Sequence, residues 1–462
     1  MPADIAARVE SIEEADLDID LLVIGAGMAG MSAAGYAAAR GARVLVLEKS
    51  RAIGGSAMLS GTTLWTAPTM DAFRELCPRG DEALGRALVD GFAAAQDWVR
   101  STGVEFGGER AVVRVGRGRR FDLLAYLNRC RALVERAGGW VLPERRVARL
   151  TSAGGRVLGA EVAEDGGVSR LRSDATLLAT GGFQGDPGMR GRYVPGGSDM
   201  LLRANPASTG DGLRLALAAG AAEAGDMSAF YGHLIASPQA SFEASDFHRL
   251  ALQYSAEGVV LNLACERILD ESQGDHVSAQ CLARQPQSRG LVVVDRSVLS
   301  SPSLGASRAL DSTVAVTRSV DEVFGDVIAS GAHIASSDDL DTLGAKVAQW
   351  GFRGANLATA VRRFNAAMAD GSPPRRWNRI PLTDPPFWAI EVRPAITFTQ
   401  GGIRVDAEAR VLRATGAPIP GLFAAGADVG GVFNGGYAGG LALGLVFGIK
   451  AARAVAGGSD GD

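Results

Sequence analysis

Short apolar runs alternate with a helical pattern near the start of the chain. Residues 21–24 are an uninterrupted apolar run, and residues 43–47 are apolar after Arg43; both suit strands buried on both faces of a parallel sheet. Between them, the alanine-rich segment 28–40 predicts a helix, and Gly41 follows at the position of a C-cap glycine. This order of elements predicts a β-α-β unit and an α/β fold.

A glycine-rich turn joins the first strand to the helix. The turn reads Gly25-Ala26-Gly27-Met28-Ala29-Gly30, and the acidic residue Glu48 ends the second strand. In dinucleotide-binding units, such glycines allow a sharp turn, close approach to a pyrophosphate and tight helix packing, while the acid accepts the ribose hydroxyls. The helix N-terminus favours the phosphates. The unit therefore predicts a bound dinucleotide and leaves NAD and FAD both open.

The C-terminal part of the chain returns to the same kind of pattern. Residues 174–178 predict a third buried strand, which runs into Ala-Thr-Gly-Gly, and residues 421–425 predict another, followed by Asp428. A glycine-rich segment then opens a helix over 441–454, whose N-terminus favours negative charge on a flavin. A nucleotide fold that closes from both ends of the chain favours FAD over NAD.

The remaining elements predict a second domain. We expect one helix over 69–104, another over 122–137, and a small antiparallel meander over 147–171. Arg114, Arg117, Arg119 and Arg120 form a basic patch that we expect in a solvated loop, with contact to an anionic substrate group as the alternative. From residue 229 the strand signals become irregular and prolines cluster. The predicted architecture is a Rossmann-like FAD-binding domain (1–228 and 389–462) with an inserted α+β cap domain (229–388).

Composition narrows the class of protein. The 462 residues carry a formal net charge of −4, which gives no indication of binding to nucleic acid or to a membrane surface. The four cysteines are scattered without a CxxC pair, so we expect free thiols and no metal site. No signal peptide or uncharged apolar run of membrane-spanning length is visible. These features predict a cytoplasmic enzyme.

An ordered set of motifs resembles one family along nearly the whole chain. The motifs are IGAGMAG, LEKSRAIGGSAMLSGTTLW, LLATGGF, STGDGLRLALAAGA, TFTQGGIRVD and GLFAAGADVGGVFNGGYAGG. They resemble the fumarate reductase/succinate dehydrogenase flavoprotein superfamily, and GGSAMLSGTTLW is most similar to its 3-ketosteroid dehydrogenase branch. The resemblance implies FAD, and the lack of a histidine near Ser56 implies that it is bound non-covalently.

The resemblance and the glycine segments together give a set of expected cofactor-binding residues. These are Gly25, Gly27, Met28, Ala29, Gly30, Glu48, Lys49, Gly54, Gly55, Ser56, Ser60, Gly61, Val147, Thr180, Gly181, Gly182, Asp211, Gly426, Asp428, Gly440, Leu441 and Ala442. Thr209 or Asp211 is also expected to cap the helix that begins near Leu213.

Departures from the dicarboxylate branch indicate a different substrate. Tyr437 stands where the resemblance places a carboxylate-binding arginine, and Thr397 where it places a histidine. A desolvated dianion needs paired charge, so these changes weaken the C4-dicarboxylate interpretation. Ketosteroid dehydrogenases place a tyrosine at the position of Tyr437, which implies that this hydroxyl and an amide near Leu441 bind a substrate ketone.

The implied reaction forms or reduces a carbon–carbon double bond next to a carbonyl. It needs a base for the α-proton and transfer of the β-hydrogen as hydride to flavin N5. We expect Tyr231 to be the base, with His233 two residues away on the same face of an extended segment, and Tyr254 in reserve. Arg393 is a candidate for binding a substrate carboxylate, with a structural ion pair as the equal alternative.

Three functions remain open at this point. The first is an FAD-dependent desaturase or ene-reductase acting on a cyclic ketone or ketosteroid-like molecule. The second is a fumarate reductase-like or tricarballylate dehydrogenase-like enzyme acting on a carboxylic acid, and the third is a flavin-binding redox partner without catalysis. Because no haem or iron–sulfur motif is visible, we expect a diffusible electron acceptor, O₂ or a redox partner protein.

Overall fold

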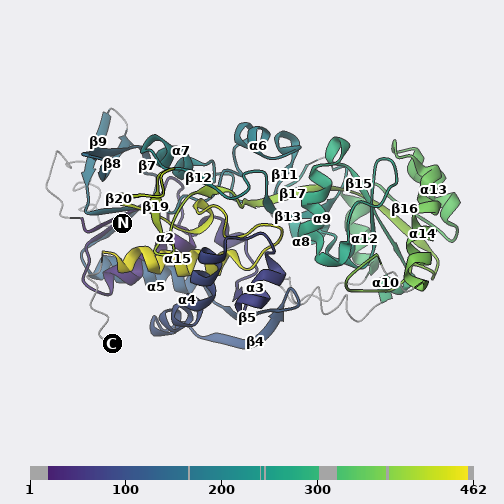
Figure 1. Cartoon of the computed structure of the whole chain (residues 1–462), viewed down its shortest axis with the longest axis horizontal. Coiled ribbons are helices and arrows are strands. Elements are labelled where there is room, and N and C mark those ends of the chain that lie inside the picture. The colour runs from purple at the N-terminus through teal and green to yellow at the C-terminus, as the bar shows by residue number, and fades with distance from the viewer. Residues whose placement is uncertain are drawn as a thin grey trace.

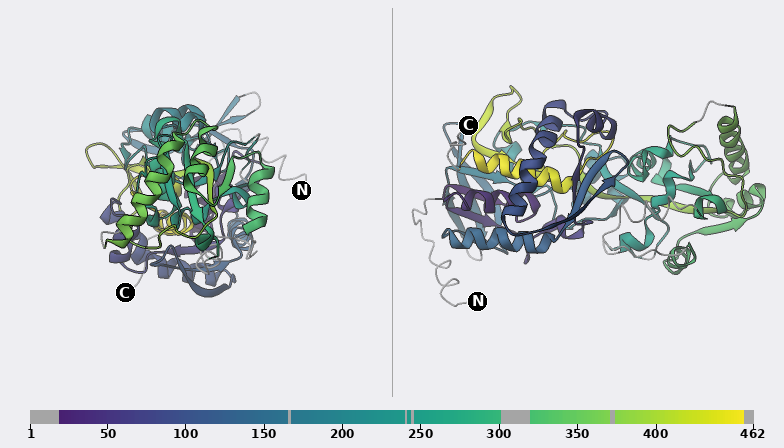
Figure 2. Two further views of the ribbon diagram at one scale, coloured as in Figure 1. Left: turned by 90° about the vertical axis from the view of Figure 1, so that its right-hand side faces the viewer. Right: turned by 90° about the horizontal axis from the view of Figure 1, so that it is seen from below.

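The molecule is elongated, with a larger lobe at one end and a smaller lobe at the other (Figure 1). The computed structural model describes residues 19–164, 167–239, 241–243, 246–300, 320–370 and 374–455. The long strand β17 (Phe387–Thr399) runs from the smaller lobe into the larger one. Seen along the long axis, the smaller lobe lies in front of the larger one (left panel of Figure 2).

A parallel sheet forms the centre of the larger lobe. Its strand order is β19-β20-β10-β1-β2-β6, and every pair is parallel except β19 with β20. The strands are β1 (Leu21–Ile24), β2 (Val44–Leu47), β6 (Trp140–Leu142), β10 (Ala175–Leu178), β19 (Arg410–Leu412) and β20 (Pro418–Ala424). Every residue of β1, β2 and β10 is buried, as their continuous apolar sequences predict.

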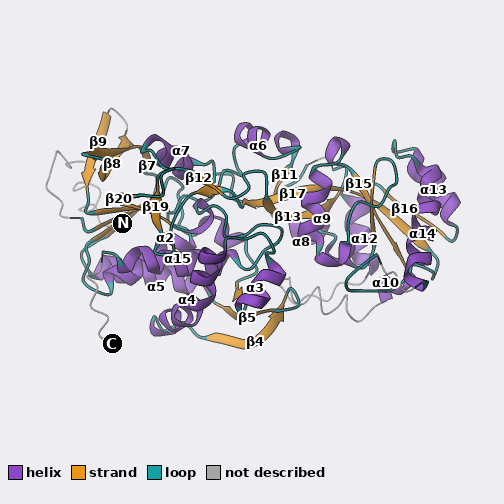
Figure 3. Ribbon diagram, viewed as in Figure 1, coloured by secondary structure: helices purple, strands orange, loops and turns teal. Residues whose placement is uncertain are grey.

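Helices cover the parallel sheet (Figure 3). Helix α2 (Met28–Ala38) is buried along its whole length and packs against α15 (Gly440–Arg453) and α5 (Leu123–Arg136). Helix α4 (Glu82–Ser101) in turn packs against α15. Small residues allow the close approach of α2 and α15, since a side chain at Gly448 would meet the backbone of Ala29. The first and last nucleotide-binding segments of the chain are therefore joined in one core.

A second sheet, built around β17, forms the smaller lobe. Strands β11, β13, β15 and β16 pair with β17, and β14 pairs with β15. Their bounds are β11 (Leu201–Leu202), β13 (Phe230–Ala236), β14 (Val259–Asn262), β15 (Gly290–Asp295) and β16 (Ile334–Ser337). The helices of this lobe are α8 (Phe247–Leu250), α9 (Asp275–Ala283), α10 (Arg296–Ser300), α12 (Val320–Ala329), α13 (Leu340–Ala348) and α14 (Leu357–Ala369).

Smaller elements complete the larger lobe. They are the three-stranded sheet of β3 (Thr63–Thr66), β4 (Phe106–Val112) and β5 (Gly116–Phe121), the meander of β7 (Arg146–Ala153), β8 (Arg156–Glu164) and β9 (Gly167–Arg172), the pair β12 (Glu223–Ala224) with β18 (Gly402–Ile403), and the helices α3 (Met70–Leu76), α6 (Pro187–Tyr193) and α7 (Asp211–Ala218). The meander agrees with the alternation seen in the sequence.

One predicted helix differs in continuity. The helix expected over 69–104 is two helices, because Asp81 caps a new N-terminus by accepting the Leu84 N–H. Strand β17 continues through Pro394, which lies opposite Leu234. The register of β13 and β17 shifts between Tyr231 and Gly232.

Two other local predictions are wrong. Gly210, with φ 78°, is the N-cap of α7, whereas Thr209 or Asp211 was expected. The arginine patch is not a solvated loop, because Arg117, Arg119 and Arg120 lie on strand β5. Arg114 lies in the turn before it and donates to the Ser272 carbonyl of the smaller lobe at 2.9 Å.

Candidate functional site

A long cavity runs along the carboxyl ends of the parallel strands and reaches the smaller lobe. It extends from the β1–α2 turn at Gly25 to Tyr231, Phe398 and Tyr437. Its empty space is about 1820 Å³, including the part open to solvent. The cavity therefore joins the glycine turn at one end to a group of aromatic side chains at the other.

Backbone rather than side chains forms the cavity wall at the β1–α2 turn. Gly25 has φ 106°, and a Cβ atom there would overlap the Ala179 carbonyl. A Cβ atom at Gly30 would overlap the Gly25 carbonyl, so Gly30 packs behind the turn and does not line the cavity. Gly27, Met28 and Ala29 line it. The three glycines have the geometric roles that the fingerprint predicts.

Glu48 lies at the cavity edge, at the end of β2. Its Oε2 atom accepts the Ala26 N–H at 2.8 Å, and its Oε1 atom accepts the Ser50 N–H at 2.7 Å. These bonds fix the carboxylate beside the glycine turn, where it faces the position expected for a ribose. The side chain is buried within the wall.

Lys49 and Asp211 form a charged pair in the same part of the wall. Lys49 Nζ lies 2.6 Å from Asp211 Oδ2 and also donates to Thr209 Oγ1 at 2.8 Å. Burial raises the pKa of the Asp211 carboxyl, but its bonds with Lys49 and Arg214 outweigh burial and lower the pKa overall. Asp211 is therefore an anion at neutral pH, and it links the β2 end to the N-terminus of α7.

The N-termini of α2, α7 and α15 all reach the cavity. In none of the three does the side chain of the N-cap residue bond to a helix N–H. The hydroxyls of Thr180 and Tyr437 accept one N–H each, from Gly212 of α7 and Gly440 of α15, and the other first-turn N–H groups face the cavity end of each helix. Helix N-termini favour anionic groups such as a diphosphate or a reduced flavin. Together with the side-chain-free cradle at Gly25 and Gly27, they fit FAD.

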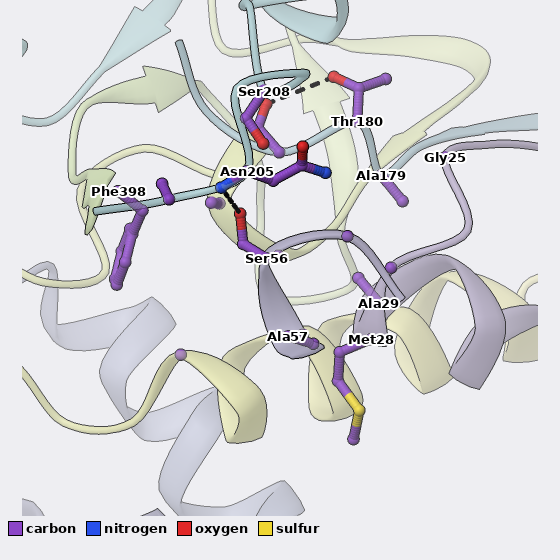
Figure 4. Close-up of a pocket in the computed structure, with 18 of the residues that line it drawn as sticks. Gly25, Met28, Ala29, Ser56, Ala57, Ala179, Thr180, Asn205, Ser208 and Phe398 are labelled. Carbon is purple, nitrogen blue, oxygen red and sulfur yellow. Dashed lines mark hydrogen bonds between the residues drawn. The ribbon is translucent and has the colours of Figure 1, made fainter. Parts of the chain in front are cut away.

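The loop that follows Glu48 crosses the middle of the cavity. Gly54, Gly55 and Ser56 line it, and Ser56 Oγ accepts the Asn205 N–H at 3.3 Å (Figure 4). The same figure shows Thr180 and Ala179 at the end of β10, across the cavity from Met28. The glycine loop and the Ala-Thr-Gly-Gly segment thus form opposite walls.

Most of the predicted cofactor-binding residues line the cavity. They are Gly25, Gly27, Met28, Ala29, Glu48, Lys49, Gly54, Gly55, Ser56, Ser60, Gly61, Val147, Thr180, Gly181, Asp211, Gly426, Gly440 and Leu441. Four predicted residues, Gly30, Gly182, Asp428 and Ala442, are not among the lining residues. They lie behind the wall and shape it.

Asp428 differs from its predicted role. It was expected to bind ribityl hydroxyls, but its carboxylate is buried and accepts hydrogen bonds from the Thr180 N–H and hydroxyl. Burial raises the pKa of this carboxyl to about 7, although the Thr180 bonds oppose the shift. Asp428 therefore holds the Thr180–Gly181 turn in place, and Thr180 and Gly181 present the cavity surface.

Aromatic side chains close the other end of the cavity. The rings of Tyr231 and Tyr437 stack with centroids 3.8 Å apart and an interplanar angle of 19°. Trp65 makes an edge contact with Tyr437 at 5.4 Å, and Phe398 packs against both tyrosines. This end suits a flat apolar molecule rather than a small dianion.

The Tyr437 hydroxyl lies at the N-terminus of α15. It accepts the Gly440 N–H at 2.7 Å. A phenol that accepts a hydrogen bond from a backbone N–H is a better donor through its own hydrogen, because the two bonds polarise one another. Leu441 lines the cavity beside it, so its backbone N–H is a second candidate donor.

His233 lines the cavity beside Tyr231 and is held from behind by Asp275. The two rings make an edge contact with centroids 5.0 Å apart, and His233 Nδ1 lies 2.8 Å from Asp275 Oδ2. By resemblance, the sequence places Asp275 near the proton-relay region of the family, but a structural role was favoured for it. Asp275 lies 42 residues after His233 in the chain. Only the packing of α9 against β13 brings its carboxylate to the histidine.

Two other predicted candidates lie elsewhere. Arg393 is on β17 opposite Ile235, and Tyr254 is buried in the core; neither is among the cavity-lining residues. The cavity contains instead an arginine that the sequence did not single out. Arg203, only 8% exposed, lines the wall and donates to Thr397 Oγ1 at 3.4 Å and the Leu59 carbonyl at 3.3 Å.

The residues that the structure describes hold no group of three or more His, Cys, Asp or Glu side chains placed to bind a metal ion. No helix among them is long and apolar enough to span a membrane. The four cysteines, Cys77, Cys130, Cys265 and Cys281, are free thiols, as predicted.

Comparison with known proteins places the chain among flavoproteins. Residues 20–441 match the family model described as FAD binding domain. The chain is 25% identical to urocanate reductase of Eggerthella lenta, covering 89% of this chain and 70% of that protein. It is 27% identical to 4-oxocyclohexanecarboxylate 2-dehydrogenase of Sinomonas cyclohexanicum, covering 95% of this chain and 93% of that protein.

A solved structure shows the same fold. The 3-ketosteroid-Δ4-(5α)-dehydrogenase of Rhodococcus jostii RHA1, in complex with 4-androstene-3,17-dione, superimposes with a TM-score of 0.74. The match covers 97% of this chain and 99% of that structure at 20% identity. The predicted α/β flavoprotein fold and the predicted resemblance are confirmed. So are the FAD cofactor and the class of FAD-dependent oxidoreductase acting on CH–CH groups.

Proposed function

Because the chain belongs to the FAD binding domain family, we propose that it is a dehydrogenase that introduces, or in reverse reduces, a carbon–carbon double bond α,β to a carbonyl group. The proposed substrate is a cyclic or ketosteroid-like ketone. One observation carries the proposal: the Tyr437 hydroxyl accepts the Gly440 N–H while its ring stacks on Tyr231 in an aromatic pocket. A hydroxyl held in this way can donate to a ketone oxygen.

Each of the chain's own groups has a separate task in this reaction. Tyr437 and the Leu441 N–H bind the ketone oxygen and stabilise the charge that develops on it when the α-carbon loses its proton. Donors in comparable sites each contribute about 3–4 kcal/mol. Tyr231 accepts the α-proton, with His233 beside it. Bound FAD supplies the two-electron acceptor for the β-hydride, or the donor in the reverse direction.

The FAD itself is held between the helix N-termini and the glycine loops, and we propose that it is bound without a covalent link. Ser56 and its neighbours contain no histidine, and among the described cavity-lining residues the single histidine, His233, is bonded to Asp275. Acid precipitation should release the yellow colour into the supernatant. Colour retained in the pellet would contradict this. The electrons pass on to a diffusible acceptor or a partner protein.

The second candidate substrate is one that carries a carboxylate, and the position of Arg203 favours it. Its guanidinium lies in the cavity wall beside Thr397 and Leu59. An arginine in a largely aromatic pocket can bind a carboxylate group through two parallel hydrogen bonds. The curated relative named for 4-oxocyclohexanecarboxylate carries both a ring ketone and a carboxylate in its named substrate. A cyclic keto-acid would use Tyr437 and Arg203 together.

Anaerobic bleaching of the bound FAD distinguishes these functions. The holoenzyme is mixed with 3-ketosteroids, with cyclohexanones with and without a ring carboxylate, and with succinate and tricarballylate. We expect bleaching only by molecules that contain the ketone. Bleaching by carboxylates that lack a ketone, and by nothing else, would overturn the proposal in favour of the carboxylate enzyme. No bleaching by any of them, with no reoxidation of reduced enzyme by the corresponding enones, would favour a redox partner without catalysis.

The variant Arg203→Met separates the two candidate substrates further. If Arg203 binds a carboxylate, the variant loses about ten- to a hundredfold in kcat/KM for the keto-acid, which corresponds to one charge-assisted bond. The rate with the neutral ketone stays within about twofold. An equal loss with both substrates would show that Arg203 supports the wall and not the carboxylate.

A further inference from the structure

The smaller lobe contains two histidine–carboxylate pairs, of which only the first has a buried histidine. His233 Nδ1 lies 2.8 Å from Asp275 Oδ2 and 3.1 Å from Oδ1. His333 Nδ1 lies 2.8 Å from Glu391 Oε2. The first pair adjoins the cavity and Tyr231, whereas the second packs on Trp350 and is not among the cavity-lining residues.

A carboxylate on one ring nitrogen determines what the other nitrogen can do. A neutral imidazole carries one N–H, and an anionic carboxylate accepts it, so the proton is held at Nδ1 and Nε2 becomes the acceptor. The same carboxylate stabilises the imidazolium that forms when Nε2 takes a proton. His233 is only 2% exposed, so solvent cannot easily provide either effect.

A helix N-terminus and two other titratable side chains surround Asp275. Asp275 begins helix α9, whose N-terminus favours an anion. Burial raises the pKa of nearby Glu257 to about 7 and lowers the pKa of the adjacent His276 to about 4. Glu257 is thus largely protonated in weakly acidic solution, and His276 is neutral. In weakly acidic solution, neither side chain therefore adds a full charge beside the Asp275–His233 pair.

We infer that Asp275 is a positioning residue that holds His233 in the Nδ1–H form, so that Nε2 takes the proton passed on by Tyr231. This inference rests on the proposed function for its catalytic part. In the oxidation, the α C–H bond breaks and its proton goes to the Tyr231 oxygen, while the Tyr231 proton goes to His233 Nε2. The carbon–carbon double bond forms as the β C–H bond breaks, and FAD, when bound, would be the two-electron oxidant that takes the hydride.

The arrangement answers a chemical difficulty of the tyrosine. A free tyrosine has a pKa near 10 and is a poor base at neutral pH. If its proton moves to an imidazole as the substrate proton arrives, full tyrosinate never has to exist. The imidazolium that results is paired at once with Asp275 at 2.8 Å. The geometry therefore assigns the net proton acceptor to the Asp275–His233 pair.

The protonated nitrogen can be read directly, without any substrate. The chain has four histidines, so ¹⁵N-histidine labelling of the holoenzyme gives few signals, which single histidine variants assign. We expect His233 to show an Nδ1–H and an unprotonated Nε2 near neutral pH. In Asp275→Asn, that pattern is lost, because an amide can donate to Nδ1 as well as accept from it. A wild-type His233 with its proton on Nε2, or on both nitrogens, would overturn the inference.

The catalytic part is tested by the rate of flavin reduction in a single turnover. We expect Asp275→Asn to slow it about ten- to a hundredfold, with substrate affinity and FAD content within about twofold of wild type. Glu391→Gln, the matched change in the other pair, should leave the rate within about twofold. Equal rates for Asp275→Asn and wild type would overturn the role of Asp275. If no substrate bleaches the flavin at all, the proposed function fails, and the nitrogen signals still decide the tautomer.

Discussion

The two ends of the cavity are built in different ways. The dinucleotide end consists of backbone from short local motifs, such as Gly25–Ala29 and Gly54–Ser56. The substrate end consists of side chains from distant segments, among them Tyr231, Phe398 and Tyr437, which meet through ring contacts. The dinucleotide end is sensitive to added side-chain atoms at Gly25 and Gly54, because a Cβ atom there would overlap neighbouring atoms. The second is sensitive to removed functional groups, because each hydroxyl or imidazole has its own task.

The largest effect is expected from adding one carbon at the dinucleotide end. Gly25→Ala places a Cβ atom against the Ala179 carbonyl at φ 106°, so the turn must shift away from its cradle. Left-handed backbone alone costs an alanine about 1–2 kcal/mol. We expect FAD occupancy to fall at least about tenfold, measured by the ratio of flavin absorbance at the visible maximum to protein absorbance.

A matched glycine separates strain from the loss of the cradle. Gly41 also has positive φ, 88°, but a Cβ atom there would meet nothing within 4 Å. Gly41→Ala should therefore lower the melting temperature slightly and leave FAD occupancy unchanged. Equal FAD loss in both variants would show that backbone strain, and not the cavity wall, governs cofactor binding.

The next effect is expected from removing one oxygen at the substrate end. Tyr437→Phe keeps the ring stacked on Tyr231 and loses the hydroxyl at the Gly440 N–H. We expect flavin reduction by a ketone substrate to slow about 10²- to 10³-fold, the loss of one oxyanion donor. The FAD absorbance ratio should stay at the wild-type value, since the hydroxyl lies at the substrate end of the cavity and not at the glycine turns.

Tyr193→Phe is the control for this change. The Tyr193 hydroxyl donates to Glu223 at 2.6 Å and does not line the cavity. Its loss should leave the rate within about twofold. A Tyr437→Phe enzyme that reduces its flavin as fast as the control would remove Tyr437 from the proposed mechanism.

The smallest effect concerns the buried carboxyl behind the substrate end. Burial raises the pKa of Glu257 to about 7 in the folded protein, above its ordinary value of 4.5. The folded state therefore binds this proton more tightly than the unfolded state, and stability is lost as pH rises from about 4.5 through about 7. We expect the wild type to lose about 2 kcal/mol more than Glu257→Gln between about pH 5.5 and about pH 8.

Denaturant unfolding at the two pH values measures this difference. The control is Glu408→Gln, because Glu408 is exposed and remote from the smaller lobe. Asp270→Asn is less suitable as a control, because Asp270 caps the turn at Ser272. The pH dependence of Glu408→Gln should match that of wild type. A Glu257→Gln protein with the full wild-type slope would show that another group carries the pH dependence.

The sequence predicted the dinucleotide end in detail because its motifs are local. A strand, a glycine turn and a helix within 30 residues form the same cradle wherever they fold, so Gly25, Gly27 and Glu48 could be named in advance. Asp428 was placed in the wrong role for a related reason. Its position after a buried strand was visible, but whether its carboxylate faces the cavity or Thr180 depends on side-chain packing.

The substrate end was predicted only in part. Tyr437 and Tyr231 were named from the resemblance and from two-residue spacing, and the structure places them in contact. Arg203 was not selected, and a structural role was favoured for Asp275. Arg203 follows a short strand with no chemical motif, and Asp275 acts through a histidine 42 residues away. Nothing in a single sequence reveals such pairs, because no local pattern links their partners.

By itself, the sequence determined the parallel sheet, the FAD-binding turn and the class of oxidoreductase, since apolar runs and glycine positions restrict the backbone directly. Only the tertiary structure decided which carboxylate holds His233, that Arg203 lines the cavity, and that Arg393 does not line it. The physical reason is one of range. Backbone conformation depends on neighbours in the chain, whereas the direction of a buried charged side chain depends on the elements that pack around it.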